Sequence, residues 1–316
     1  MVIVERRKRK GPVLTPSSLP CLGKMPTINI TEGCAHGCVY CYTQGYSGFP
    51  GQGRITLVNN IPDLVRTELK RKRRKPRRVY FSPSSDAFQP VSEVLNVTYR
   101  TMDILLDHGV EVALLTKGYI DERFLRLFAN ARARVFAQIG ITTLDDDLRR
   151  AIEPSAASVP QRLETIAGLL RSGVSVRARL DPLIPGLTDT AENLRPLLAE
   201  LQKRGIHSIA ASYLFLRPAF GRRLAEQLSR LPGLTNVADW AWHRFADGVG
   251  GGHMIDTNQR RQRFARLTDL AAEFGIEVSI CSCKNPDLPE ATNCRIAGPS
   301  MEHTPQPEAP LFEHLG

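Results

Sequence analysis

The sequence predicts an α/β fold, arranged as a partial (β/α)6 barrel of the TIM type with a C-terminal extension that carries a second metal site. The first observation is alternation: β-branched and aromatic runs near positions 27, 79, 111, 135, 174 and 209 each precede a segment of helical periodicity. Such alternation is typical of a parallel sheet covered by helices. The second is the number of units, because six cannot close an eight-stranded barrel and therefore leave an open side. The third is a group of cysteines beyond the last unit.

Turn and cap residues place the expected elements in order along the chain. Strands are expected at residues 27–30, 78–82, 110–117, 135–142, 174–180 and 209–218. The first helix begins near Asn60, a favourable N-cap, with Pro62 in its first turn. Further helices are expected at residues 95–108, 121–128, 145–152, 160–173 and 190–205. Asp121 caps the second of these, and Gly173 ends the fourth.

Four regions follow from this pattern. Residues 1–24 form a basic, extended tail with few side chains that could join a core. Residues 25–220 form the barrel, in which residues 44–53, rich in glycine and serine, are an irregular loop. Residues 221–300 form a C-terminal lobe of helical pattern with a cysteine cluster. Residues 301–316 form a disordered tail.

Basic residues are concentrated in two runs. The chain of 316 residues carries a net charge of +10, and its pI is about 9.5. The run from Lys70 to Arg78 reads KRKRRKPRR, and residues 6–10 read RRKRK. Such runs suit a polyanion, so we predict nucleic-acid binding through residues 70–78. The alternative is a solvated surface loop in a protein that uses arginine heavily throughout.

Composition also indicates the compartment. No apolar run is long enough to span a membrane, and the charged first ten residues lack the apolar core of a secretion signal. We therefore expect a soluble cytoplasmic protein that does not contact a membrane. Seven cysteines occur as two groups of three and a single residue, Cys21. In a chain without an export signal, grouped thiols indicate metal binding rather than disulfides.

Three cysteines between residues 34 and 41 form the most informative motif. Cys34, Cys38 and Cys41 have the spacing C-x3-C-x2-C, which lets one loop present three thiolates to one cluster. Thiolate selects iron–sulfur clusters or zinc. Three ligands on a four-iron cluster leave one iron open to bind and activate another molecule. Zinc is the first alternative, although His36 is awkwardly placed as its fourth ligand, and a redox disulfide is the second, which leaves one cysteine over.

The motif resembles the signature of the radical S-adenosylmethionine (SAM) superfamily, in which an aromatic residue precedes the last cysteine, as Tyr40 does here. Residues 29–42, NITEGCAHGCVYCY, are similar to the spore photoproduct lyase-like subgroup. The resemblance implies that Cys34, Cys38 and Cys41 ligate a catalytic [4Fe–4S] cluster and that Tyr40 lies at the cofactor. It also implies that SAM binds the open iron and is cleaved reductively to methionine and a 5′-deoxyadenosyl radical, which abstracts hydrogen from a substrate. An electron donor such as flavodoxin or ferredoxin is implied as well.

A polar loop after the second strand is the expected site for the SAM amino group. Residues 83–90 read PSSDAFQP, and polar loops at the carboxyl ends of barrel strands are common ligand sites. The subgroup has a Ser/Thr- and Asp-containing loop followed by Gln-Pro at this place, which Ser84, Ser85 and Asp86 resemble. The resemblance implies that these residues orient SAM, with the Asp86 carboxylate facing the SAM ammonium. The alternative is an ordinary capped turn before a helix.

The resemblance implies further SAM contacts at later strand ends. Thr116 ends the third strand in a Thr-Lys pair similar to that of the family. Gln138 lies where most relatives carry a serine and where side chains face the SAM ribose. Ile184 belongs to a DPLIPGLTD segment that resembles a subgroup loop, and this region packs on adenine in the superfamily. Arg179 and Tyr213, at strand ends facing the expected cavity, are candidates for the SAM carboxylate and for the substrate.

A second group of cysteines follows a short strand expected in the C-terminal lobe. Cys281 and Cys283 have the spacing C-x-C, and ten residues separate them from Cys294. Three cysteines again suit an iron–sulfur cluster, with an open iron or with a fourth ligand from elsewhere. Candidates for that fourth ligand are Cys21, His253 and His303. The alternatives are zinc with a histidine ligand, and structural thiols. This group is a departure from the spore photoproduct lyases themselves.

Three functions from different classes are compatible with these patterns. The first is a radical SAM enzyme that acts on a nucleic-acid base or lesion, which the basic runs and the resemblance favour and which requires the base to be unstacked. The second is a radical SAM enzyme that modifies a peptide or small metabolite bound near the second cluster. The third is a non-enzymatic iron–sulfur or zinc protein, in which Cys38→Ala alters stability alone. The sequence leaves open which hydrogen is abstracted and whether SAM is regenerated.

Overall fold

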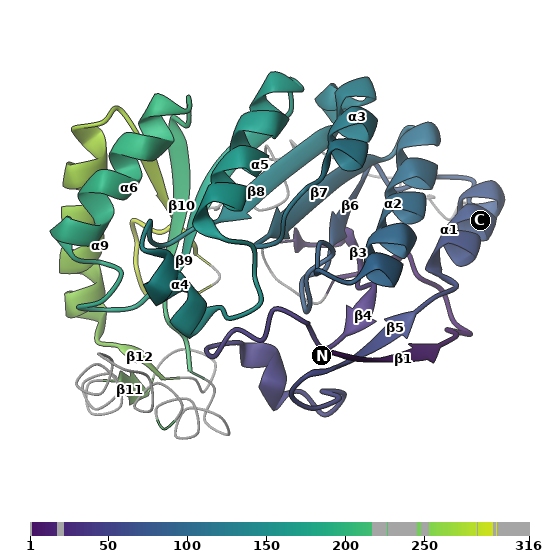
Figure 1. Ribbon diagram of the computed structural model, residues 1–316, viewed down its shortest axis with the longest axis horizontal. Helices are drawn as coiled ribbons and strands as arrows, with labels where there is room; N and C mark the ends of the chain where they lie inside the picture. The colour runs from purple at the N-terminus through teal and green to yellow at the C-terminus, as the bar shows by residue number, and fades with distance from the viewer. Residues whose placement is uncertain are drawn as a thin grey trace, which may run out of the picture.

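The fold is described from a computed structural model, which defines residues 2–17, 22–216, 226, 245–247, 253–282, 284–292 and 295. Within these ranges, parallel strands alternate with helices along the chain. The helices form a layer over one face of the central sheet (Figure 1). The predicted α/β class is therefore confirmed.

The central sheet has eight strands in the order β2–β3–β6–β7–β8–β9–β10–β13. Its six barrel strands are parallel: β3 (Pro26–Ile28), β6 (Arg78–Phe81), β7 (Glu111–Thr116), β8 (Val135–Gly140), β9 (Ser175–Leu183) and β10 (Ser208–Tyr213). They correspond to the six predicted strands. β2 (Thr15–Pro16) pairs antiparallel at one edge, and β13 (Glu277–Ile280) pairs parallel at the other. The described sheet does not close, which confirms the open barrel.

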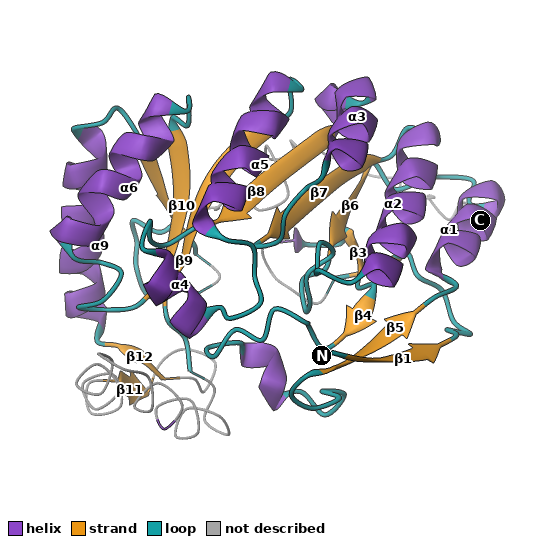
Figure 2. Cartoon of the chain, viewed as in Figure 1, coloured by secondary structure: helices purple, strands orange, loops and turns teal. Residues whose placement is uncertain are grey.

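The helices follow the predicted order (Figure 2): α1 (Ile61–Arg71), α2 (Ser92–Asp107), α3 (Glu122–Asn130), α4 (Asp146–Ile152), α5 (Val159–Arg171), α6 (Ala191–Lys203) and α9 (Thr257–Ala272). Asp121 caps α3 as predicted, because its carboxylate accepts the N–H groups of Arg123 and Phe124 at 3.0 and 3.2 Å. Asn60 forms no such cap on α1. Its side chain instead exchanges two hydrogen bonds with the backbone of Arg9, at 2.9 and 3.0 Å.

The basic N-terminal segment is not a free tail, contrary to the prediction. β1 (Ile3–Arg7) pairs parallel with β5 (Arg54–Val58), which also pairs antiparallel with β4 (Thr31–Glu32). Val13 and Leu14, further along the same segment, are buried in the main apolar core. The predicted irregular loop is followed directly by β5, a strand the sequence prediction missed. This small sheet holds the polypeptide on both sides of the cysteine motif.

The C-terminal region adds a helix and strands to the barrel. α9 and β13 confirm the predicted helical pattern and short strand in part. The prediction of helix fails at β11 (Phe245–Asp247) and β12 (His253–Ile255), which pair antiparallel. Across the part of the chain that the structure describes, no helix is both long and apolar enough to cross a bilayer.

One end of the basic run, residues 70–78, is buried in the central sheet. All four residues of β6 are buried, as is usual for a parallel strand covered on both faces. The first of them is Arg78, whose guanidinium lies 2.7 Å from a Glu111 carboxylate oxygen and 4.2 Å from the ring centre of Phe136. Arg78 is therefore a core residue and not part of a nucleic-acid surface, which corrects one end of the predicted run.

Candidate functional site

The cysteine loop lies between β4 and the 3-10 turn Tyr42–Gly45, and backbone contacts fix it at the barrel. It begins at Gly33, whose φ is +75°; a Cβ there would lie 2.7 Å from Pro50 and 2.8 Å from the carbonyl oxygen of Arg54. Only glycine fits this close approach. Further on, the N–H of Val39 donates to the carbonyl of Ile152 at 3.0 Å, at the end of α4.

Cys34, Cys38 and Cys41 are half-buried thiols on this loop, and none forms a disulfide. Burial raises the pKa of Cys34 and Cys38 well above the usual value, and a nearby carboxylate, Asp86 for Cys34 and Glu153 for Cys38, raises it further, as do the neighbouring cysteines. Thiolates here therefore need a nearby positive charge, such as the irons of a cluster supply. Cys41 Sγ lies 3.0 Å from the Thr43 hydroxyl, a hydrogen-bonding contact that suits a thiolate ligand.

A cluster differs from a single metal ion in the ligand spacing that it requires. Within the described ranges, no three His, Cys, Asp or Glu side chains are gathered around one point as a mononuclear ion would require. A four-iron cluster takes one thiolate per iron around a cube. The donor set of three soft thiols on one short loop fits that group.

The second-strand loop is joined directly to the cysteine loop. Gln89 Oε1 accepts the N–H of Ala35 at 2.6 Å, and Gln89 Nε2 donates to the Thr31 hydroxyl at 2.8 Å. Tyr42 donates its hydroxyl to the carbonyl oxygen of Pro83 at 2.6 Å. The sequence placed these two loops at one site only through resemblance, and the hydrogen bonds show that they touch.

The Asp86 carboxylate accepts hydrogen bonds from this loop and from the end of β7. Its Oδ1 accepts the N–H of Phe88 at 2.8 Å and the Thr116 hydroxyl at 2.7 Å, and its Oδ2 accepts the N–H of Lys117 at 2.9 Å. His36 Nδ1 approaches Oδ2 at 3.5 Å. Thr116 and Asp86, both predicted cofactor contacts, are therefore bound to each other. A carboxylate still has acceptor capacity beyond three hydrogen bonds, so an ammonium group can share it.

Two serine hydroxyls beside Asp86 are available to a ligand. The Oγ atoms of Ser82 and Ser85 are buried and have no hydrogen-bond partner among the described residues. Ser82 has a φ of +54°, a left-handed conformation that is uncommon for serine and is often found at functional sites. Ser84 donates its N–H to the side chain of Asn29 at 3.0 Å. Unpartnered polar atoms at this place fit the polar end of SAM.

A buried charge network lies behind the cysteine loop, and the sequence did not predict it. The Glu153 carboxylate is fully buried; it pairs with Arg162, accepts the Tyr40 hydroxyl and lies 3.5 Å from Lys117 Nζ. Burial alone would raise the pKa of Glu153, but Lys117, Arg162 and the Tyr40 hydrogen bond outweigh it and lower the pKa to about 2. Lys117 Nζ also lies 5.3 Å from the Tyr40 ring centre. The network fixes Tyr40 beside the cysteines.

A second charged group lies at the end of β9. Arg179 donates to Asp181 Oδ2 at 2.9 and 3.0 Å and to Gln138 Oε1 at 3.3 Å, so two predicted cofactor residues are joined. Lys284 Nζ reaches the same carboxylate at 2.8 and 3.0 Å from its two oxygens. Burial alone would raise the pKa of Asp181, but Lys284, Arg179 and Lys117 hold it well below its usual range.

The two remaining predicted contacts have different surroundings. Ile184 is fully buried in an apolar cluster that Tyr40 packs against, so it lies close to the cysteine loop. Tyr213, in contrast, does not face the cavity as predicted. Its ring packs on Phe264 of α9 at 4.9 Å between centres, and its hydroxyl lies 3.0 Å from Asp189 Oδ2. A register shift in the pairing of β10 with β9 between Ala211 and Tyr213 makes the end of this strand irregular.

The second cysteine group is described only at its start. Cys281 is buried beside Ala210 of β10, and Asn285 donates its amide to the Cys281 carbonyl at 2.9 Å. The other predicted members of this site lie outside the described residues or have undescribed side chains: Cys283, Cys294, Cys21, His253 and His303. A second cluster therefore stays a prediction.

Comparison with known proteins adds family relationships to this geometry. The family model of the radical SAM superfamily matches residues 28–198. An uncharacterised protein of Mycobacterium tuberculosis is 27% identical over 200 residues, which cover 60% of this chain and 59% of that protein. The radical SAM Nalpha-GlyT isomerase of Pseudomonas phage M6 is 25% identical over 250 residues, which cover 78% of this chain and 51% of that protein. The chain thus spans between half and three-fifths of these relatives.

Solved structures share the fold over most of the chain. A spore photoproduct lyase mutant with bound S-adenosylmethionine and dinucleoside spore photoproduct superposes with a TM-score of 0.66, at 14% identity, and the match covers 87% of this chain and 81% of that one. At this identity the similarity establishes the fold alone.

Proposed function

This chain belongs to the radical SAM superfamily, and we propose that it acts on a nucleic-acid base or base lesion by hydrogen abstraction with a [4Fe–4S] cluster and SAM. A cluster with an open iron supplies, when bound, the electron that cleaves SAM to the abstracting radical. The observation that carries the proposal is the joining of the cysteine loop to the Ser/Asp loop through Gln89, Ala35 and the Asp86 contacts.

Different residues of this chain are proposed to bind the cluster and SAM. Cys34, Cys38 and Cys41 are the proposed cluster ligands. The hydroxyl of Ser85 and the shared carboxylate of Asp86 are the proposed acceptors for the SAM ammonium, because the Ser85 oxygen is buried without a described partner and the Asp86 carboxylate has acceptor capacity left.

The remaining proposed contacts shape the cavity around the cofactor. Tyr40 and Ile184 offer apolar surface, and the buried Glu153 network keeps the tyrosine hydroxyl in place. Arg179, held by Asp181 and by Gln138, offers a fixed cation for a carboxylate.

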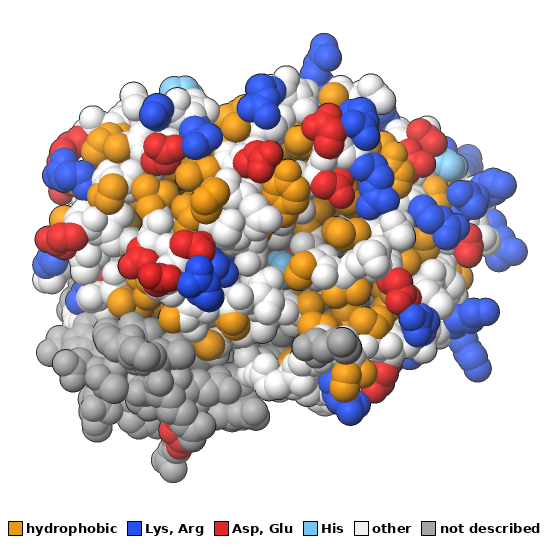
Figure 3. All heavy atoms as spheres, in the orientation of Figure 1, with side chains coloured by type: hydrophobic (Ala, Val, Ile, Leu, Met, Phe, Trp, Pro, Cys, Tyr) orange, Lys and Arg blue, Asp and Glu red, His pale blue; other side chains and the backbone are white. Residues whose placement is uncertain are grey.

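Charge on the outer surface supports the substrate class. Six consecutive residues from 70 to 75, all Lys or Arg, are exposed at the end of α1 and beyond it. Figure 3 shows Lys and Arg side chains gathered at the end of the molecule where α1 lies. Nucleic acid binds such a surface by release of counterions, so the affinity depends strongly on salt. The spore photoproduct lyase structure holds a dinucleoside photoproduct, which favours the same class here.

Salt-dependent binding tests this substrate class. We expect the affinity of the wild type for a fluorescent single-stranded oligonucleotide to fall steeply between 50 and 200 mM salt, because log K falls linearly with log[salt] with a slope of about −0.7 per neutralised phosphate. Arg73→Gln/Arg74→Gln should flatten the slope by about 1.4 and weaken binding. Arg126→Gln/Arg150→Gln, which removes two exposed charges elsewhere, is the matched control. Equal slopes for both double variants would contradict the proposal.

A second candidate substrate is a peptide or small metabolite, and one observation favours it. The ion pair of Lys284 with Asp181 holds the start of the second cysteine group against the end of β9, near the proposed cofactor cavity. A substrate held by that group would then lie within reach of the cavity. SAM cleavage that a peptide mixture stimulates and oligonucleotides leave unchanged would favour this candidate.

A further inference from the structure

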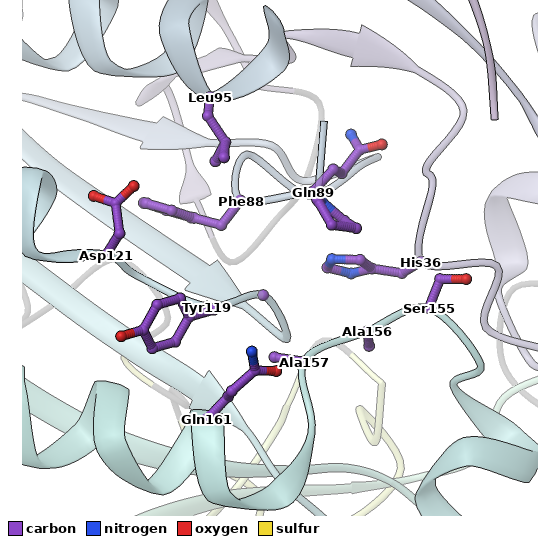
Figure 4. Close-up of a pocket in the computed structure, with 12 residues that line it drawn as sticks. His36, Phe88, Gln89, Leu95, Tyr119, Asp121, Ser155, Ala156, Ala157 and Gln161 are labelled. Atoms are coloured by element: carbon purple, nitrogen blue, oxygen red, sulfur yellow. The ribbon is translucent and has the colours of Figure 1, made fainter. Parts of the chain in front are cut away.

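A separate cavity of about 280 Å³ lies on the helix side of the cysteine loop. Its walls come from the second-strand loop, the starts of α2, α3 and α5, and the segment between α4 and α5 (Figure 4). Gly118 closes one wall tightly, because a Cβ there would lie 2.0 Å from the carbonyl oxygen of Phe88. The proposed SAM contacts at Ser85, Arg179 and Ile184 do not line it. The cavity is therefore distinct from the cofactor site.

One buried polar atom in this cavity has no partner. His36 is 2% exposed, and its Nε2 forms no hydrogen bond with any described residue. Figure 4 shows the imidazole extending from the cysteine loop into the space between Phe88, Gln89 and Ala157. The Asp86 carboxylate, 3.5 Å from Nδ1, can only accept a hydrogen bond, so this geometry favours the tautomer with the proton on Nδ1 and a lone pair on Nε2. Buried polar atoms are nearly always satisfied, so a donor is expected here.

The other lining groups define the rest of the ligand. Phe88, Leu95 and Ala157 provide apolar surface, and the Phe88 ring suits a flat partner. Asp121 is the one formally charged side chain among the described lining residues. Its Oδ1 caps α3, and a carboxylate has a second oxygen for a further donor. An anion is disfavoured beside it, and a neutral or cationic group is favoured.

We propose that this cavity binds a small flat molecule that carries N–H donors, of the aromatic amine or amidine class. One N–H donates to His36 Nε2, the flat body packs on Phe88, and the uncharged or cationic end faces Asp121. The volume lies just below the range of about 300–1,000 Å³ that is usual for ligand sites, which fits a single ring with one polar substituent.

The cavity is coupled to the cysteine loop because His36 belongs to both. His36 stands between Cys34 and Cys38, and its carbonyl accepts the N–H of Ser155, a second lining residue, at 3.0 Å. A ligand on Nε2 therefore restrains the loop that is proposed to hold the cluster. Binding of the ligand and binding of the cluster are thermodynamically linked. Loading of the cluster must therefore change the affinity for the ligand by the same factor by which the ligand changes the affinity for the cluster.

Binding of benzamidine, measured by ligand-observed NMR titration, tests the proposal in cluster-free and cluster-loaded protein. We expect saturable binding to the wild type and at least tenfold weaker binding of benzoate, which has the same size but is an anion without N–H donors. Ala157→Leu, which fills the cavity without altering the cysteine loop, should weaken benzamidine binding at least tenfold. His36→Phe should do the same, and His207→Phe, at an exposed site, should not.

Each part of the proposal can be overturned separately. Equal binding of benzamidine and benzoate, or unchanged binding in Ala157→Leu, would overturn the assigned site even if His36→Phe failed to fold. A benzamidine Kd that stays the same when the cluster is loaded would overturn the coupling. Neither result depends on SAM cleavage, so the enzyme proposal stands or falls by other measurements.

Discussion

Glu153→Gln removes the negative charge at the centre of the buried network behind the cysteine loop. The carboxylate is 0% exposed and faces two cations, Arg162 and Lys117, together with the Tyr40 hydroxyl. Glutamine keeps the volume and one acceptor oxygen, so the change is mainly one of charge. Breaking a buried ion pair by removing one partner costs about 3–5 kcal/mol, because the remaining charge is left uncompensated.

Thermal unfolding of the cluster-free protein, followed by circular dichroism, measures this cost. At about 2 °C per kcal/mol for a chain of this size, Tm should fall by about 6–10 °C. Glu122→Gln is the matched control, because Glu122 and its partner Arg126 are 72% and 68% exposed, and such pairs contribute little. Its Tm should change by about 1 °C or less. If the two variants melted within about 2 °C of each other, the network would not stabilise the site as argued.

Three further predictions follow from named contacts. Gly118→Ala places a Cβ 2.0 Å from the Phe88 carbonyl oxygen, so denaturant titration should show a loss of about 2 kcal/mol or more. The hydrogen bonds from Arg149 lower the pKa of Asp146 from 3.8 to about 2. The ionised Asp146 carboxylate therefore stabilises the fold above about pH 4, and this contribution is lost as the pH falls towards about 2. The difference in Tm between wild type and Asp146→Asn should vanish over the same interval. Lys284→Met removes two hydrogen bonds to a β9 carboxylate, so limited proteolysis should cut the C-terminal region faster.

The barrel strands and the cysteine loop were predictable because their signals are local. Most of the strands are short runs rich in apolar residues, β9 alternates apolar and polar residues, and the thiol spacing is read directly from residues 34–41. β5 was missed because Arg54–Val58 is short and its partner β1 lies about fifty residues earlier in the chain. Pairing between distant segments leaves no periodic mark on either one. Because residues 1–24 are basic and have few apolar side chains, the sequence favoured an extended tail over a strand.

Side-chain direction and burial of charges were the parts that could not be predicted. Tyr213 was placed in the cavity because it lies at the end of a predicted strand, but the register of β10 shifts just before it, and the sequence does not show such a shift. Arg162 and Glu153 look like ordinary surface charges in a helical region, yet both are about 1% exposed because each satisfies the other. His36 was considered only as an awkward zinc ligand, since a cavity on the far side of its loop has no sequence signature.

Reductive cleavage of SAM is the central claim, and one anaerobic measurement tests it most directly. Wild type and a Cys34→Ala/Cys38→Ala/Cys41→Ala variant are reconstituted with iron and sulfide, assayed for both elements, and incubated with dithionite and SAM. We expect about four fewer irons in the variant and 5′-deoxyadenosine from the wild type alone. Equal iron content in the two proteins, or a cluster-loaded wild type that forms no 5′-deoxyadenosine with or without oligonucleotide, would contradict it.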